Sequence, residues 1–346
     1  MFKGMIAVLG TMLCLVSVPE MGHAKLDPET PPQRNSELLE VSSWPETVDT
    51  VYGFEWDASN YAQLAGFSQT ALTEVASDAY WKQDIGYACF VTRTVELENE
   101  AGAKLGLTVM ATRHYKAAKT HLLIRYSSRS SGNLDAHGST YGLSLGDVSV
   151  IRDVPNDPDG FEGSQSNNLV FIRGNLLVEC VLKDSVTPSA GFTAAGLAAS
   201  IDATILAQRQ ACSGDYPKPS ATVEIENPNG DLSSLPPAVK SMTTDVSVTT
   251  SHPGEKPVKT KVFISHWNEP KIMDDDGVWH PDPTRDPSWY VQIDHEDGFV
   301  DDVHSPTKLT MRTGQGGGNF QLVIVAWGPN LVPVFATDDF TITRKP

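Results

Sequence analysis

The chain has 346 residues, of which 40% are hydrophobic and 20% are charged. This composition is typical of a globular protein and excludes an intrinsically disordered one. The 26 basic and 43 acidic side chains give a formal net charge of −17. Because such a surface repels phosphate groups, nucleic acid and anionic lipid are excluded as main partners.

The first 24 residues have the layout of a secretory signal peptide. Lys3 supplies the positive start, residues 5–18 form an apolar run, and residues 22–24 place small side chains at the cleavage site. A membrane anchor needs about 20 apolar residues, more than this run contains. Leu13 is too bulky for the position before a lipidated Cys14, which argues against a lipoprotein. We therefore expect a secreted or periplasmic protein with no transmembrane segment after cleavage.

The remaining chain is long enough for two domains. Residues 25–43 are polar and rich in proline, which predicts a flexible leader. The first domain is expected over residues 44–212. Within it, the spacing of apolar residues predicts a helix over residues 60–76, with Asp57 or Ser59 as its N-cap.

Further elements of the first domain follow from the period of the apolar residues. Alternation predicts strands over residues 86–98, 105–114, 145–151, 168–172 and 176–182. Helical spacing predicts helices over 116–128 and from Thr187-Pro188 onward, the second with a buried stripe at Leu197, Ile201 and Ile205. Together these elements predict an α+β domain, an antiparallel sheet with helices on one face.

The second domain is expected to be an all-β sandwich. Residues 213–219 have the composition of a linker, and the helical period is absent from 220–346. Short β-rich runs are found at residues 221–226, 245–250, 259–267, 289–294, 308–313, 320–327 and 340–344. Such runs between turn-rich connections are typical of an immunoglobulin-like sandwich.

The end of the chain carries the one family resemblance. Residues 318–327 (Gly-Asn-Phe-Gln-Leu-Val-Ile-Val-Ala-Trp), followed by 339–343 (Asp-Phe-Thr-Ile-Thr), resemble the closing strands of bacterial immunoglobulin-like domains. The resemblance covers only the part after residue 220 and implies a binding or spacer module, because this fold serves many unrelated functions. The Cys-Trp-Cys core of antibody domains is absent, since no Cys follows Cys212.

Three cysteines remain after cleavage, an odd number for an oxidising compartment. They are Cys89, Cys180 and Cys212. Cys89 lies in a strand-like run, where a buried Cys acts as a small apolar residue. We expect a disulfide between Cys180 and Cys212, because Cys212 follows a helix in a polar turn and is free to reach a partner.

The most unusual local chemistry is an acidic loop with aromatic neighbours. Asp274, Asp275 and Asp276 repel one another unless water or a cation bridges them, so a calcium site is one interpretation. Sugar binding is a second, because aromatic rings beside carboxylates suit sugars. The candidate ligand-binding residues are Trp279, Trp289 and Tyr290. A solvated loop is the third and commonest case. The turn at residues 294–304 has the same ambiguity, whereas 156–162 favours a structural turn.

No recognisable catalytic motif is present: the sequence lacks the Gly-x-Ser-x-Gly, His-Glu-x-x-His, Walker and Gly-x-Gly-x-x-Gly patterns. We therefore expect a non-catalytic binding or scaffolding protein of the cell envelope, with no cofactor other than calcium. Its partner would be an envelope protein or a carbohydrate. The alternative is a carboxylate-dependent hydrolase of polysaccharide or peptidoglycan, with a deep cleft lined by His114, Asp147 or Glu179 and a carboxylate of raised pKa. A purely structural envelope protein would instead expose large apolar patches.

Overall fold

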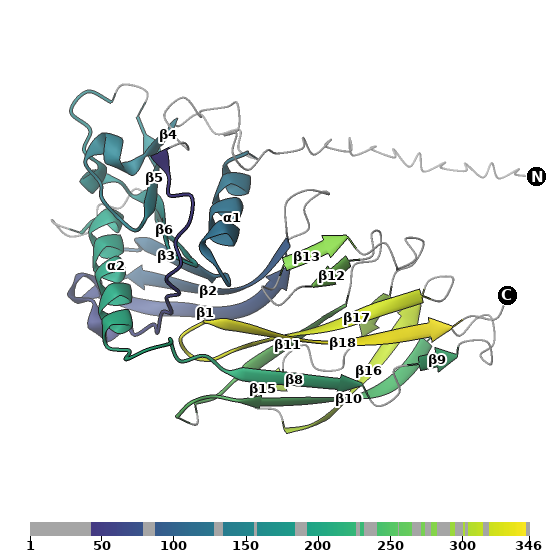
Figure 1. Cartoon of the computed structure of the whole chain (residues 1–346). Coiled ribbons are helices and arrows are strands. Elements are labelled where there is room, and N and C mark those ends of the chain that lie inside the picture. Colours follow the sequence, from purple (N-terminus) through teal and green to yellow (C-terminus); the bar gives the residue numbers. More distant parts are fainter. Residues whose placement is uncertain are drawn as a thin grey trace, which may run out of the picture.

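The structure is a computed structural model of the chain (Figure 1). It describes residues 43–78, 87–127, 134–155, 158–183, 192–225, 229–231, 241–254, 256–264, 271–273, 278–281, 291–294, 300–301, 304–313 and 318–343. The predicted signal peptide and the leader up to residue 42 lie outside these residues.

A large antiparallel sheet forms the first part of the protein. Its strands from this part are β1 (Phe67–Asp78), β2 (Tyr87–Asn99), β3 (Lys104–Ala111), β4 (Leu134–His137), β5 (Val148–Val154), β6 (Asn168–Arg173) and β7 (Leu176–Lys183). Short 3-10 helices connect them: η3 (Ala58–Asn60), η4 (Ala62–Leu64), η5 (Gly138–Tyr141) and η6 (Gly163–Gln165). The strand order is β12-β13-β2-β3-β7-β6-β5-β4, and β1 pairs with β2.

Two α-helices, α1 (Tyr115–Ser127) and α2 (Ala194–Gln210), are found in the part of the chain that the structure describes. They lie on opposite faces of the sheet (Figure 1). Leu122 of α1 is in the same core cluster as Val170, whereas Leu197 of α2 is in the cluster of Leu169 and Phe171. Because neighbouring residues of a strand point to opposite faces, the two helices cover different sides of β6. The predicted placement of helices on one face is therefore wrong.

The predicted α+β class is also wrong, because the structure is mostly β. The main cause is the predicted helix over residues 60–76. Most of this segment belongs to strand β1, which pairs with β2 from Phe67 to Asp78. The strand is largely exposed over residues 68–73, more buried over residues 74–77, and has a β-bulge between Gln69 and Ala71. Long-range pairing has overridden the local helical spacing.

Other local predictions for this part are confirmed. The hairpin of β2 and β3, helix α1, and the buried stripe of α2 at Leu197, Ile201 and Ile205 are all present. The N-cap of α2 is Thr193, whose hydroxyl accepts a hydrogen bond from the Gly196 amide at 2.9 Å. The helix therefore begins after the predicted Thr187-Pro188 start.

The C-terminal part is a β-sandwich of a four-stranded sheet, β14-β16-β10-β8, and a five-stranded sheet, β15-β11-β17-β18-β9. Its strands are β8 (Ser220–Ile225), β9 (Asn229–Asp231), β10 (Ser241–Ser251), β11 (Lys259–Ile264), β14 (Val291–Asp294), β15 (Val300–Asp301), β16 (His304–Thr313), β17 (Gly318–Trp327) and β18 (Pro333–Thr343). Each strand predicted after residue 219 is found here, with different ends. Sequence reasoning missed β12 (Lys271–Met273) and β13 (Val278–Pro281), which extend the first sheet by pairing β13 with β2.

The two parts share one hydrophobic core. Val323, Val325 and Trp327 of β17 are fully buried in the same cluster as Phe54 and Ala76 of the first part. An ion cluster lies beside this contact. Arg93 of β2 bonds to Glu74 of β1, and Glu74 also accepts a hydrogen bond from the Trp327 indole at 3.2 Å. The sandwich is therefore fixed to the sheet by apolar and polar contacts together.

Candidate ligand-binding site

An open hollow of about 630 Å³ lies beside β1 and the end of α2. We call it the Trp56 hollow, and it is lined by Glu55, Trp56, Asp57, Ala58, Asn60, Gln69, Leu72 and Gln208. Its volume is within the range of about 300–1,000 Å³ that is usual for small-molecule sites. The hollow combines one indole and one aliphatic side chain with carboxylates and amides.

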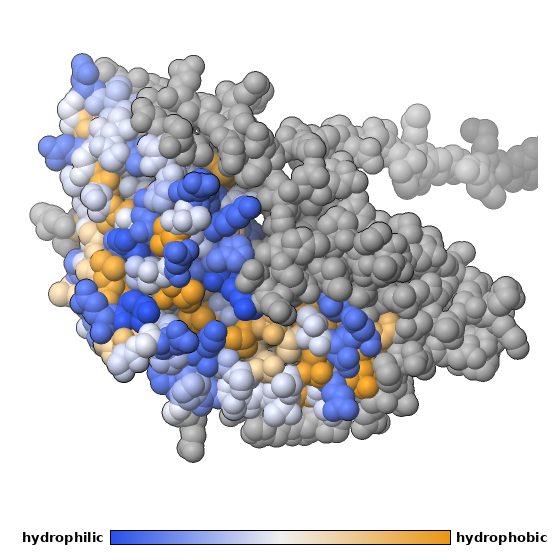
Figure 2. All heavy atoms as spheres, in the orientation of Figure 1, coloured by the Kyte–Doolittle hydropathy of each residue, from blue (hydrophilic) through white to orange (hydrophobic). Residues whose placement is uncertain are grey.

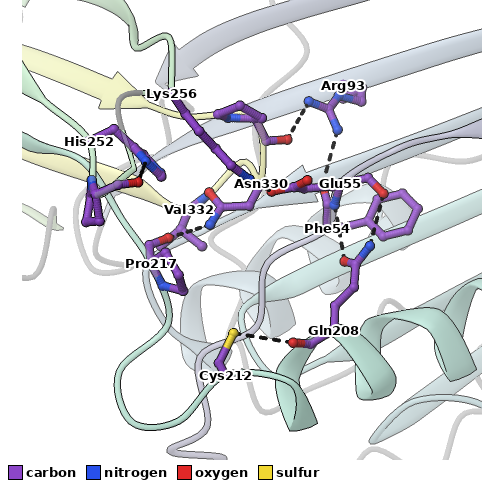
Figure 3. Close-up of polar contacts among 12 residues, drawn as sticks. Phe54, Glu55, Arg93, Gln208, Cys212, Pro217, His252, Lys256, Asn330 and Val332 are labelled. Carbon is purple, nitrogen blue, oxygen red and sulfur yellow. Dashed lines mark hydrogen bonds and ion pairs between the residues drawn. The ribbon is translucent and has the colours of Figure 1, made fainter.

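The segment before β1, which contains Trp56, is held by hydrogen bonds to the sandwich and to helix α2. The Phe54 amide donates to the Asn330 carbonyl of the sandwich at 2.9 Å. Next to it, Gln208 of α2 accepts from the Glu55 amide and donates to the Glu55 carbonyl, both at 3.2 Å (Figure 3). Because both backbone groups of Glu55 are bonded to one helical side chain, the chain enters the hollow in a defined direction.

The Trp56 ring is held in one orientation. It stacks on Tyr61 with ring centroids 5.4 Å apart and planes at 18°, and Tyr61 itself is buried. The Trp56 indole nitrogen donates to the Gln69 side-chain oxygen at 3.2 Å. These contacts preorganise the indole, so that binding a ligand does not require ordering this side chain.

Polar groups surround the indole. Asp57 accepts hydrogen bonds from the Ser59 hydroxyl at 2.7 Å and the Ser59 amide at 2.9 Å. These two bonds hold the pKa of Asp57 below its ordinary value. Glu55 forms an ion pair with Lys256 of the sandwich. Asp57 is therefore ionised at neutral pH, and Glu55 lies beside a lysine.

Leu72 supplies an apolar contact in the hollow. With 49% of its surface exposed, it is the one large hydrophobic side chain that is exposed in the described part of the chain. Elsewhere on the visible described surface, apolar residues form small patches between polar ones (Figure 2). Leu72 and the ordered Trp56 therefore supply the apolar part of the lining of the hollow.

The three residues that would line a hydrolase cleft do not line the Trp56 hollow, and each makes other contacts. The His114 ring accepts a hydrogen bond from the Ala117 amide at the start of α1, at 3.1 Å. Asp147 binds Arg173, with a 3.1 Å contact. Glu179 forms an ion pair with the buried Arg152 at 2.6 Å.

The predicted acidic loop falls mostly outside the described residues. This applies to Asp274, Asp275, Asp276, Trp289 and Tyr290. Trp279 lies in β13, where its backbone pairs with Tyr87 of β2 and Met273 of β12. Among the residues that the structure does describe, no group of three or more His, Cys, Asp or Glu side chains could hold a metal ion. The calcium interpretation stays a prediction.

The cysteines predicted to pair are both free thiols in this structure. Cys180 is fully buried in β7, and burial raises the pKa of its thiol. Cys212 follows α2, and its thiol donates to the Gln208 carbonyl at 3.3 Å. Cys180 is buried in the core and Cys212 lies at the end of its helix, so the structure does not join them, and the disulfide stays a prediction.

Sequence reasoning missed the residues of the hollow. Trp56, Gln69 and Gln208 belong to a connecting segment, a strand and a helix, and no local motif joins them. One signal was available: aromatic side chains occupy alternate positions at Tyr52, Phe54 and Trp56. Of these three residues, Phe54 lies in the core, and Tyr52 and Trp56 lie at the boundary between core and solvent.

No family model matches the chain, and no curated protein does either. Among solved structures, the chain is similar to the PapD-like domain 7 of human CEP192, at 14% identity and a TM-score of 0.21, over 36% of this chain and 84% of that one. It is also similar to murine CRIg, at 13% identity and a TM-score of 0.21, over 37% of this chain and 99% of that one.

These neighbours have PapD-like or immunoglobulin-like folds. A TM-score of 0.21 carries no argument about function, and the resemblance to bacterial immunoglobulin-like domains stays a prediction. In the part of the chain that the structure describes, no helix has the length and apolar character needed to cross a bilayer.

Proposed function

We propose that the protein is exported to the cell envelope and acts there as a non-catalytic binding protein, with the Trp56 hollow as its binding site. The ligand is a carbohydrate or an envelope protein. Export rests on the N-terminal sequence pattern, and the sandwich holds the binding surface in place.

The preorganised indole is the observation that carries this proposal. Trp56 is stacked on Tyr61 and bonded to Gln69, and it lines an open hollow together with the exposed Leu72. An ordered aromatic side chain beside an exposed aliphatic one favours binding, because both gain free energy when a ligand covers them. The contacts between Glu55 and Gln208 support the same role by fixing the wall of the hollow.

The hydrolase alternative requires a carboxylate of raised pKa. Asp57 and Glu74 are carboxylates with a displaced pKa, and both pKa values are lowered. A lowered pKa keeps a carboxyl ionised at neutral pH, which does not suit a general acid. Neither of these two carboxylates therefore suits the acid of a hydrolase, which supports the binding proposal.

A co-sedimentation experiment tests the proposal. The mature chain, residues 25–346, is incubated with insoluble cell-wall material and with envelope membranes, and the bound fraction is measured after centrifugation. New reducing ends in the supernatant are measured in the same samples. We expect binding without released sugar. Release of reducing ends would support the hydrolase instead, and absence of binding to both fractions would refute the proposed function.

A further inference from the structure

A ligand in the hollow would contact an apolar ring face of the Trp56 indole rather than its N–H group. The N–H already donates to Gln69 at 3.2 Å, and one ring face is covered by Tyr61. A ligand in the hollow would therefore contact the remaining ring surface. Leu72 lines the same hollow and is half exposed, so it extends the apolar area next to the indole.

The charges of the hollow disfavour an anionic ligand. Glu55 is paired with Lys256, which leaves Asp57 as the carboxylate without a cationic partner among the lining residues. An anion would be repelled by Asp57 and by the net charge of −17. A cation would be attracted by Asp57 and by the indole face, so a cationic ligand is the competing case that the test below must separate. A neutral ligand is not repelled by these charges.

The remaining polar groups match hydroxyl groups. Asn60 is exposed, and its side-chain amide offers both a donor and an acceptor. Gln69 lines the hollow and accepts from Trp56 through its oxygen, so its amide nitrogen remains as a donor. Asp57 uses one oxygen for Ser59, which leaves the other as an acceptor. A hydroxyl donates and accepts at once, and this mixed set satisfies both functions.

We infer that the Trp56 hollow binds a pyranose ring of a neutral polysaccharide, with the apolar face of the sugar on the Trp56 indole and its hydroxyls bonded to Asp57, Asn60 and Gln69. This inference rests on the proposed binding function and names its ligand class. Because the hollow is open to solvent rather than enclosed, it accepts a ring inside a polymer chain as well as a terminal one.

Calorimetric titration of the mature chain tests the inference. The probes are hexasaccharides of glucose (β-1,4 and α-1,4 linked), xylose and N-acetylglucosamine, together with spermidine as a cationic probe. We expect at least one neutral hexasaccharide to bind and spermidine to bind more weakly. Trp56→Ala should weaken sugar binding at least about tenfold, because stacking on the ring is lost, and Trp56→Phe should restore part of it.

Two further variants distinguish a loss of ligand contacts from misfolding of Trp56→Ala. Leu72 is exposed, so Leu72→Ser leaves the core intact, and it should weaken sugar binding severalfold. Lys104→Met changes an exposed residue outside the hollow and should leave binding unchanged. The inference is overturned if no neutral hexasaccharide binds, if folded Trp56→Ala and Leu72→Ser both bind like wild type, or if spermidine binds tightest and Asp57→Asn abolishes this.

The inference and the proposed function can fail separately. If Trp56→Ala still co-sediments with cell-wall material as wild type does, the envelope-binding function stands and the hollow is not its site. If wild type binds neither the envelope fractions nor any hexasaccharide, both are refuted.

Discussion

Replacing Arg93 tests whether the ion cluster between sheet and sandwich stabilises the fold. The guanidinium donates to Glu74 at 2.9 Å, to the Phe54 carbonyl at 3.1 Å and to the Pro329 carbonyl at 2.8 Å. The Arg93 and Glu74 side chains are only 6% and 11% exposed. Arg93→Met would therefore remove one donor from the buried Glu74 carboxylate and from the carbonyls of Phe54 and Pro329.

The expected cost follows from this burial. Removing one partner of a buried ion pair costs about 3–5 kcal/mol, because the remaining charge is not solvated. After the change, Glu74 retains the Trp327 indole at 3.2 Å and Lys259 at 3.5 Å, which places the expected loss at the lower end of this range. The double variant Arg93→Met with Glu74→Met should be more stable than Arg93→Met alone, since no charge is then left buried.

Urea denaturation, followed by fluorescence and by circular dichroism, measures these differences. Two probes are needed because a chain with two packed parts need not unfold in one step. Lys104→Met is the matched control: its pair with Glu98 is exposed and 4.0 Å long, so it should cost less than about 1 kcal/mol. A loss below about 1 kcal/mol for Arg93→Met, or additive losses in the double variant, would refute the reasoning.

Three other predictions concern pH, the α2 contact and the thiols. Burial alone would raise the pKa of Glu74, but the interaction with Arg93 outweighs burial, and the pKa lies below its ordinary value of 4.5. The stability advantage of wild type over Glu74→Gln should therefore be full above pH 4.5 and shrink as the pH falls further. Urea titrations at each pH would measure this advantage. Asp202→Ala should cost about 3 kcal/mol in the same assay, because Asp202 binds the Arg173 guanidinium through both oxygens, at 2.8 and 2.7 Å. Alkylation followed by peptide mass mapping, without reductant, should modify Cys212 in the native protein and Cys180 only after unfolding. Protection of both thiols that persists after unfolding would indicate the disulfide instead.

Local patterns in the sequence were sufficient wherever neighbours along the chain decide the structure. The β2–β3 hairpin needs only two alternating runs and a turn, and α1 needs only its spacing of apolar residues. The strands of the sandwich are short and separated by turn residues, so they too could be predicted. Their ends differed, because pairing with neighbouring strands sets how far each strand continues.

The rest depends on contacts between distant residues. Leu72, Val75 and Ala76 have helical spacing, yet they lie in strand β1, because β2 pairs with β1 along its length. The opposite placement of α1 and α2 depends on which side of β6 each helix meets. The hollow joins Glu55 to Gln208, which are 153 residues apart. No pattern within a short window contains such information.

Hydrogen–deuterium exchange locates the bound ligand most directly. The mature chain is compared with and without saturating cell-wall oligosaccharide, and amide protection is read peptide by peptide. The structure predicts new protection in residues 53–61 and 67–73, which contain all the lining residues of the Trp56 hollow except Gln208. Protection confined to other regions, such as residues 274–290, or no protection on binding, would contradict the assignment of this hollow as the binding site.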